Sequence, residues 1–153
     1  MPNVTFTLDM NLLVYSVDHR DPIRHTLAVE IVRRSSSADC LLTLQAVSEF
    51  YAVLSRKRII GQAHAARLAA DWLDLFRSAP PSATAIRLAL DAASTGRASY
   101  WDALLIATAA EAGCSAILTE ELSHGTTLFG VRIVNPFAGD GLSPEADRLL
   151  TAA

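Results

Sequence analysis

Four acidic positions of this sequence follow predicted elements in equivalent ways. Asp9 ends an apolar strand-like run, and Glu49 lies one helical turn beyond a second such run. Asp102 lies in the first turn of a long predicted helix, and Glu120–Glu121 follow another apolar run. Carboxylates that converge repel one another, and the usual solutions are a shared proton or a bound cation. Because hard oxygen ligands favour Mg²⁺ or Mn²⁺, the pattern indicates a divalent-metal site.

Most of these acids also have a structural explanation. Ser99 and Asp102 have the spacing of a capping box, and an acid in a first helical turn complements the helix dipole. Glu120–Glu121 could be first-turn acids after a capping Thr119, and Glu49 could lie on a solvated helix face. Asp9 is the hardest to explain in this way, because it ends a strand between apolar neighbours. The metal site therefore depends on the conjunction of all four positions.

These acids can meet only if the elements before them share one sheet. Apolar alternation and short apolar runs predict strands, and apolar residues three to four apart predict amphipathic helices. The predicted strands are Val4–Leu8, Cys40–Thr43, Ser82–Ile86, Ser115–Thr119 and Val131–Val134. The predicted helices are a segment capped by Asn11, then Ile23–Arg34, Gln45–Lys57, Ala65–Phe76, a stretch ending at Thr95, and Ser99–Ala112.

Strands that alternate with helices predict an α/β fold, with a central, mainly parallel sheet between two helical layers. In such a sheet the carboxyl ends of the strands share one edge, where ligands bind. We expect one domain over residues 1–153, in which residues 137–153 form a peripheral tail with a short helix from Ser143.

Composition narrows the class of protein. Hydrophobic residues make up 51% of the chain and charged residues 19%, which is typical of a globular domain. No apolar run is long enough for a membrane span, and no signal peptide is recognisable, so we expect a cytoplasmic protein without a membrane partner. Cys40 and Cys114 are expected to be buried free thiols.

The charge and the remaining motifs exclude several functions. A net charge of −3 argues against a broadly basic nucleic-acid binder. There is no glycine-rich phosphate loop and no nucleophile elbow, and the four histidines lack ligand spacing. Trp72 and Trp101 are expected to anchor the core. The dense basic cluster Arg56-Lys57-Arg58 could hold a phosphate backbone or could equally be a solvated helix end.

Several segments together resemble the PIN-domain family, and specifically the VapC-type toxins of bacterial type II toxin–antitoxin systems. The resemblance covers nearly the whole chain. In order, the segments are Phe6-Thr-Leu-Asp9-Met-Asn11-Leu-Leu-Val-Tyr15, Gln45-Ala-Val-Ser-Glu49-Phe50, Ser99-Tyr-Trp-Asp102-Ala-Leu-Leu-Ile-Ala107, Ile117-Leu-Thr-Glu-Glu-Leu122 with His124-Gly125, and Val131-Arg-Ile-Val-Asn-Pro-Phe137.

The resemblance implies a compact α/β/α domain and a Mg²⁺- or Mn²⁺-dependent endoribonuclease. Asp9, Glu49 and Asp102 match the acidic positions of the family. Asn11 and Thr119 match its supporting amide and hydroxyl.

The fourth acid departs from the family pattern, because Glu121 stands where an aspartate is common, so that either Glu121 or Glu120 could serve. We expect Asp9 and Asp102 to bind the principal metal, with Glu49 and Glu121 completing the site. Such a metal would orient and activate a water for attack on a phosphodiester.

The resemblance further implies three partners: an RNA substrate, a second copy of the chain and a cognate antitoxin. The helices between Gln45 and Phe76 are the candidate partner surface. Two alternatives to the toxin remain. One is a nuclease of the same fold that processes RNA or cuts DNA without an antitoxin, and the other is a binding module that has lost catalysis.

Overall fold

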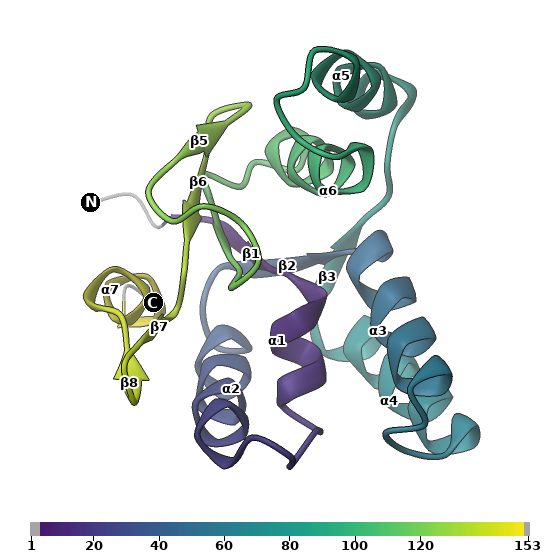
Figure 1. The fold of residues 1–153 in the computed structure, drawn as a ribbon, viewed down its shortest axis with the longest axis vertical. Coiled ribbons are helices and arrows are strands. Elements are labelled where there is room, and N and C mark those ends of the chain that lie inside the picture. Colours follow the sequence, from purple (N-terminus) through teal and green to yellow (C-terminus); the bar gives the residue numbers. More distant parts are fainter. Residues whose placement is uncertain (1–3, 152–153) are drawn as a thin grey trace.

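The computed structural model describes residues 4–151, whose strands form one large sheet and a small hairpin (Figure 1). The large sheet has the strand order β3-β2-β1-β4-β6-β5. Strand β5 pairs antiparallel with β6, and the other four pairs are parallel. The strands are β1 (Phe6–Leu8), β2 (Cys40–Thr43), β3 (Arg77–Ala79), β4 (Ala116–Leu118), β5 (Thr127–Leu128), β6 (Val131–Val134), β7 (Phe137–Ala138) and β8 (Gly141–Leu142).

Helices cover both faces of the large sheet (Figure 1). They are α1 (Met10–Tyr15), α2 (Pro22–Ser35), α3 (Leu44–Arg56), α4 (Gln62–Leu75), α5 (Ala83–Ser94), α6 (Tyr100–Glu111) and α7 (Pro144–Thr151). Helices α1 to α4 lie on one side of the strands, and α5 and α6 lie on the other (Figure 1). The predicted three-layer α/β/α architecture with a mainly parallel sheet is therefore confirmed.

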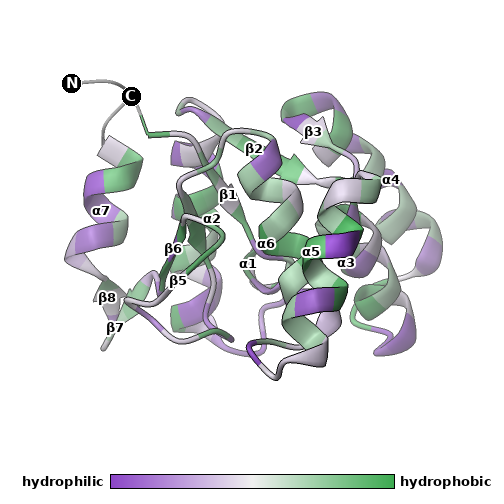
Figure 2. Ribbon diagram, turned by 90° about the horizontal axis from the view of Figure 1, so that it is seen from above, coloured by the Kyte–Doolittle hydropathy of each residue, from purple (hydrophilic) through white to green (hydrophobic). Residues whose placement is uncertain are grey.

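The two faces of the sheet divide the core. Phe6 and Leu8 of β1 pack into the cluster formed with α1 to α4, whereas Ile117 and Ile133 pack against α6. This division follows from the period of two along a strand, and strands covered on both faces need apolar residues on both. Figure 2 shows hydrophobic colour concentrated on the inner strands and on the helix faces that meet them.

The register of β1 places the site residues together. Leu8 of β1 pairs with Leu118 of β4, so the residues that follow, Asp9 and Thr119, lie at the same edge of the sheet. The backbone N–H of Asp9 donates to the carbonyl oxygen of Leu118 at 3.0 Å, which extends this parallel pairing by one residue.

Two local predictions were wrong. The strand expected over Ser82–Ile86 lies earlier, as β3, and Ser82 instead caps α5 by accepting a hydrogen bond from the N–H of Ala85 at 3.0 Å. Two prolines precede Ser82, and without N–H groups they cannot continue a strand ladder. The second error concerns α1, which is capped by Asp9 and not by Asn11.

The C-terminal segment differs from the expected peripheral tail. Helix α7 lies at one end of the molecule beside α2 (Figure 1), yet Phe137, Ala146 and Leu150 are buried in the main core cluster. Arg34 of α2 also forms an ion pair with Asp147 at 2.9 Å. A short amphipathic helix can bury its apolar face only against another element. Helix α7 buries Ala146 and Leu150, and it contacts α2.

Three further expectations can be compared with the structure. Cys40 and Cys114 are free and buried, as predicted. Trp101, expected in the core, is 63% exposed. No helix within residues 4–151 is long and apolar enough to cross a membrane.

The burial of the C-terminal helix can be tested by truncating a side chain. Leu150→Ala should lower the free energy of unfolding by about 2 kcal/mol or more, because a core side chain leaves a cavity. Leu90→Ala is the matched control, since Leu90 is 55% exposed and its loss should change stability by less than about 0.5 kcal/mol. Urea denaturation measures both variants, and equal, small effects would show that α7 contributes little to the core.

Candidate metal centre

Asp9 is the centre of the candidate site. Its side chain is 6% exposed, and both of its carboxylate oxygens accept hydrogen bonds. Oδ1 accepts from the backbone N–H of Met10 at 2.7 Å, which caps α1. Oδ2 accepts from the hydroxyl of Thr119 at 2.8 Å. A strand end, a helix start and a neighbouring strand thus hold this carboxylate in one orientation.

The environment of Asp9 disfavours its negative charge. Burial raises the pKa of Asp9 to about 6, although the hydrogen bonds from Thr119 and Met10 oppose the change. The nearby charges of Glu121 and Glu49 raise the pKa further. A carboxylate held buried near two other acids is the electrostatic setting that a cation relieves.

Thr119 links Asp9 to the loop that carries the last acid. The N–H of Glu121 donates to the Thr119 hydroxyl oxygen at 3.2 Å, and the same hydroxyl donates to Asp9. No helix follows β4 directly, so the alternative that Glu120 and Glu121 are first-turn helix acids is excluded. The Thr119 hydroxyl therefore connects the backbone N–H of Glu121 to the carboxylate of Asp9.

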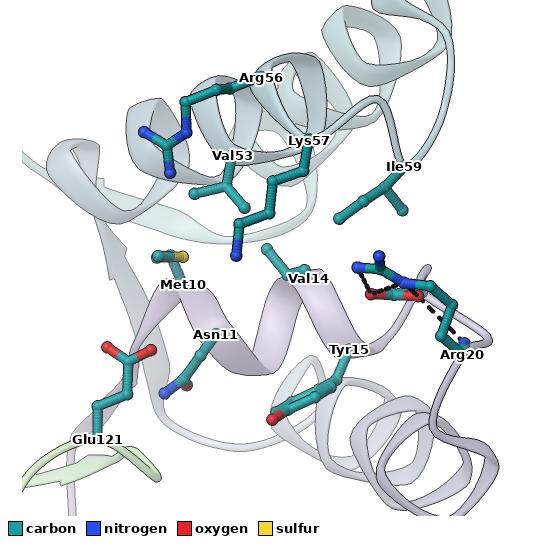
Figure 3. A pocket seen from close by; sticks show the side chains of 11 residues that line it. Met10, Asn11, Val14, Tyr15, Arg20, Val53, Arg56, Lys57, Ile59 and Glu121 are labelled. Carbon is teal, nitrogen blue, oxygen red and sulfur yellow. Dashed lines mark hydrogen bonds and ion pairs between the residues drawn. The ribbon is translucent and has the colours of Figure 1, made fainter.

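The structure distinguishes the two adjacent glutamates. Glu120 forms an ion pair with Arg24 at 2.6 Å and accepts a hydrogen bond from the Tyr15 hydroxyl at 2.6 Å. Glu121 instead lines a pocket of about 440 Å³ together with Asn11 (Figure 3), and within residues 4–151 it forms no ion pair. Glu121 is thus the better candidate for the fourth acid.

Asn11 carries the clearest sign of a missing partner. The side chain is 8% exposed, and within the described residues neither its amide oxygen nor its amide nitrogen has a hydrogen-bond partner. A buried amide without partners is costly to the folded state. Asn11 lines the pocket beside Glu121 (Figure 3), where an ion, a water or a substrate group would satisfy it.

Glu49 is held by a residue that the sequence did not indicate. Gln45, one turn earlier on α3, donates from Nε2 to Glu49 Oε1 at 2.6 Å and to the carbonyl oxygen of Trp101 at 2.9 Å. The sequence did contain a signal for this contact, because Gln45 and Glu49 are four residues apart and therefore share one face of the helix. Gln45 thereby links α3 to the first turn of α6.

Asp102 lines a different pocket from Glu121 and Asn11. It lies half-buried in the first turn of α6, where its N–H donates to the Ser99 hydroxyl at 3.2 Å. Its side chain lines another pocket, with Arg97 and Ser123 among its neighbours. Ser99 therefore caps α6, but within the described residues the Asp102 carboxylate does not return the second hydrogen bond of a capping box, so it is free for another role.

The donor set can be compared with what a divalent cation requires. Within residues 4–151 no group of three or more Asp, Glu, His or Cys side chains is arranged to hold a metal ion. Mg²⁺, however, usually keeps several waters and takes only one or two carboxylates plus substrate phosphates. Asp9 and Glu121 fit this smaller set, and the partnerless amide of Asn11 lies beside them.

Comparison with known proteins identifies the family. The model of a family described as "PIN domain" matches residues 6–122. The chain belongs to the PIN-domain family. The matched range contains every candidate acid, from Asp9 to Glu121.

Two solved structures are similar to this PIN domain. One is VapC20 of Mycobacterium tuberculosis, a toxin that cleaves the sarcin–ricin loop, with a TM-score of 0.61, 18% identity, and 74% of this chain and 87% of that chain covered. The other is PAE2754 from Pyrobaculum aerophilum, with a TM-score of 0.53, 18% identity, and 78% and 83% covered. At these identities the likeness shows the fold. No curated protein matches the sequence closely enough to count as a relative.

The raised pKa of Asp9 predicts how stability depends on pH in the metal-free protein. With a pKa of 3.8 ordinarily and about 6 when folded, the native state binds more protons than the unfolded state in this window. The free energy of unfolding should therefore fall as pH rises from about 4 to 7, by roughly 3 kcal/mol. Urea denaturation in chelator gives the free energy of unfolding of wild type and of Asp9→Asn at each pH. The difference between the two proteins isolates the contribution of Asp9. A difference that is constant over this range would contradict the raised pKa.

The two glutamates can be separated by metal titration. Glu121→Gln should weaken Mn²⁺ binding at least about tenfold, because it removes a charged oxygen ligand. Glu120→Gln is the matched control, and it should leave Mn²⁺ affinity unchanged while loosening the contacts with Arg24 and Tyr15. Calorimetry measures both affinities. The reverse pattern would assign the site to Glu120.

Proposed function

We propose that this PIN-domain protein is a Mg²⁺- or Mn²⁺-dependent endoribonuclease that acts in the cytoplasm as the toxin of a toxin–antitoxin pair. The observation that carries the proposal is the buried Asp9, held by Thr119 and Met10 beside Glu121 and the partnerless amide of Asn11. Membership of the PIN-domain family supports a nuclease, and the similarity of the fold to VapC20 supports the toxin assignment.

The roles of the residues follow from their surroundings. Asp9 and Glu121 would hold the cation, and Thr119 keeps the Asp9 carboxylate in its orientation. Asp102 and Glu49 lie on α6 and α3, which Gln45 connects, and they would extend the donor set when substrate closes the site. Asn11 would hold a water or a phosphate oxygen through its free amide.

The chemistry divides between the cation and the chain. Asp9 and Glu121 would hold a divalent cation, which would supply Lewis acidity and lower the pKa of a bound water. Among the described residues, no serine, cysteine or histidine lines the pocket that holds Asn11 and Glu121, in keeping with direct attack by water. The carboxylates of the site orient the water, and burial of Asp9 keeps the local dielectric low, which strengthens each electrostatic contact.

The proposed protein partners would use the exposed apolar residues of α3 and α4. Tyr51, Leu73 and Leu75 are exposed on these helices, within the segment Gln45–Phe76 that the sequence analysis selected. Exposed large apolar side chains on neighbouring helices are typical of an interaction surface. An antitoxin helix and a second copy of the chain are the proposed occupants.

The proposal predicts cleavage that depends on both the metal and the acids. Asp9→Asn and Asp102→Asn should each lower the cleavage rate at least about 100-fold. Loss of a group that only hydrogen-bonds to a metal ligand costs about 10- to 100-fold, and loss of a charged ligand itself should cost more. Gel assays on defined single-stranded RNA, structured RNA and DNA, with Mg²⁺, Mn²⁺ or chelator, measure this. Asp74→Asn is the control, since Asp74 is exposed and without an ion pair among the described residues.

The outcomes separate the rival functions. Cleavage of RNA that chelator or Asp102→Asn abolishes supports the ribonuclease, and wild-type activity of Asp102→Asn would remove that residue from the site. Cleavage of DNA with no cleavage of RNA would replace the proposed substrate. Folded protein that binds Mn²⁺ but cleaves nothing would favour the non-catalytic binding module.

A further inference from the structure

The pocket beside the candidate metal centre has two chemically different sides (Figure 3). It lies between α1 and the C-terminal end of α3. Asn11 and Glu121 lie on one side, and the charge of Glu121 acts on the buried Asp9. Arg56 and Lys57 reach towards it from α3 on the other side, and apolar side chains such as Val53 and Val14 line the space between them.

The two cations of this pocket are available for a ligand. Arg56 and Lys57 are exposed, and neither forms an ion pair or a side-chain hydrogen bond with any residue from 4 to 151. The third cation at the pocket, Arg20, is instead neutralised by Asp18, with an ion pair of 2.8 Å. Unpaired arginine and lysine side by side are suited to phosphate, arginine through its planar fork and lysine as a point charge.

The opposite side provides a second, independent sign of a ligand. Asn11 is more than nine-tenths buried, lines the pocket, and has no partner for its amide oxygen or nitrogen within the described chain. Its amide can donate to a phosphate oxygen and accept from a water or a sugar hydroxyl. Cations alone could be a solvated helix end, whereas the partnerless amide of Asn11, on the Glu121 side of the pocket, is a second sign of a missing partner.

We propose that this pocket is the track for the RNA backbone, in which Arg56 and Lys57 bind a phosphate next to the one that is cleaved. This inference rests on the proposed function, because the scissile phosphate must lie at Asp9 and Glu121. Because an RNA backbone repeats its phosphates, one phosphate can bind the metal ion held by Asp9 and Glu121. The neighbouring phosphate can then bind Arg56 and Lys57. Because phosphate contacts carry no base information, the track positions the strand and does not select its sequence.

An RNA strand fits this polarity better than an acidic polypeptide does. An acidic side chain could pair with Arg56 or Lys57, but it would not require the partnerless amide of Asn11 or the carboxylate of Glu121 at the far side. The protein is also net negative, with a charge of −3, so affinity for RNA must come from local cations. The unpaired Arg56 and Lys57 at the mouth of the site meet that need.

The test measures RNA binding apart from cleavage. Wild type and Arg56→Gln/Lys57→Gln are titrated, in chelator, into a fluorescein-labelled single-stranded RNA of mixed sequence at several salt concentrations. Loss of both cations at this one phosphate should weaken binding about tenfold and reduce the slope of log affinity against log salt by about 0.7. Arg67→Gln/Arg87→Gln is the matched control, with the same change of net charge at exposed, unpaired arginines elsewhere.

A charge-conserving variant keeps the result specific. Arg56→Lys/Lys57→Arg should retain the salt slope of wild type, and circular dichroism melting compares the folding of every variant. Equal affinity and slope for wild type and Arg56→Gln/Lys57→Gln would overturn the track. The proposal would also be overturned if Arg56→Gln/Lys57→Gln bound RNA like wild type and lost binding only to polyglutamate. That result would assign Arg56 and Lys57 to an acidic protein partner.

Cleavage distinguishes failure of the track from failure of the proposed function. In Mg²⁺ or Mn²⁺, Arg56→Gln/Lys57→Gln should lower kcat/KM for RNA about tenfold while kcat at saturating RNA changes little. If wild type cleaves RNA and the variant has an unchanged KM, the nuclease stands and the track is wrong. If wild type cleaves no RNA but the variant binds it more weakly, the basic patch stands and the nuclease is wrong.

Discussion

The burial of one carboxylate at the junction of β1 and α1 constrains the rest of this structure. Asp9 ends a strand, caps a helix and accepts a hydrogen bond from Thr119 of the neighbouring strand end. Its burial raises its pKa to about 6, so the fold keeps a charge where water cannot fully solvate it. Such a group is stable only when a proton or a cation balances it, and the same strain makes it suited to bind a metal.

The surrounding elements divide the work of supporting that carboxylate. Residues that hold the site are themselves held: Tyr15 and Arg24 restrain Glu120, and Gln45 restrains Glu49. Within residues 4–151, the side chains of Asn11, Glu121, Arg56 and Lys57 at the pocket have no hydrogen-bond or ion-pair partner. Of these, only the buried Asn11 lowers the stability of the folded state by lacking a partner, whereas the exposed Glu121, Arg56 and Lys57 are hydrated and available for a ligand.

The core of α/β proteins explains why the fold was predictable and several details were not. Strands buried on both faces have distinctive apolar runs, and β1, β2, β4 and β6 lie where those runs predicted them. Strand β3 was misplaced because Arg77–Ala79 is short and polar, and only pairing with Leu41–Thr43 makes it a strand. Trp101 was misplaced because α6 is apolar on all sides, so periodicity could not show which side faces solvent.

Residue types and order along the chain were enough to identify the family and to propose the acids with the supporting Asn11 and Thr119. Chain order specifies which residues follow a strand, and a parallel sheet carries those residues to one edge. The sequence could not decide between Glu120 and Glu121, or reveal that Asp102 and Glu121 line different pockets. Those outcomes depend on which side chains meet across elements distant in sequence, as when Arg24 of α2 reaches Glu120 after β4. Only tertiary packing sets such contacts, because local patterns contain no information about partners that lie almost a hundred residues away.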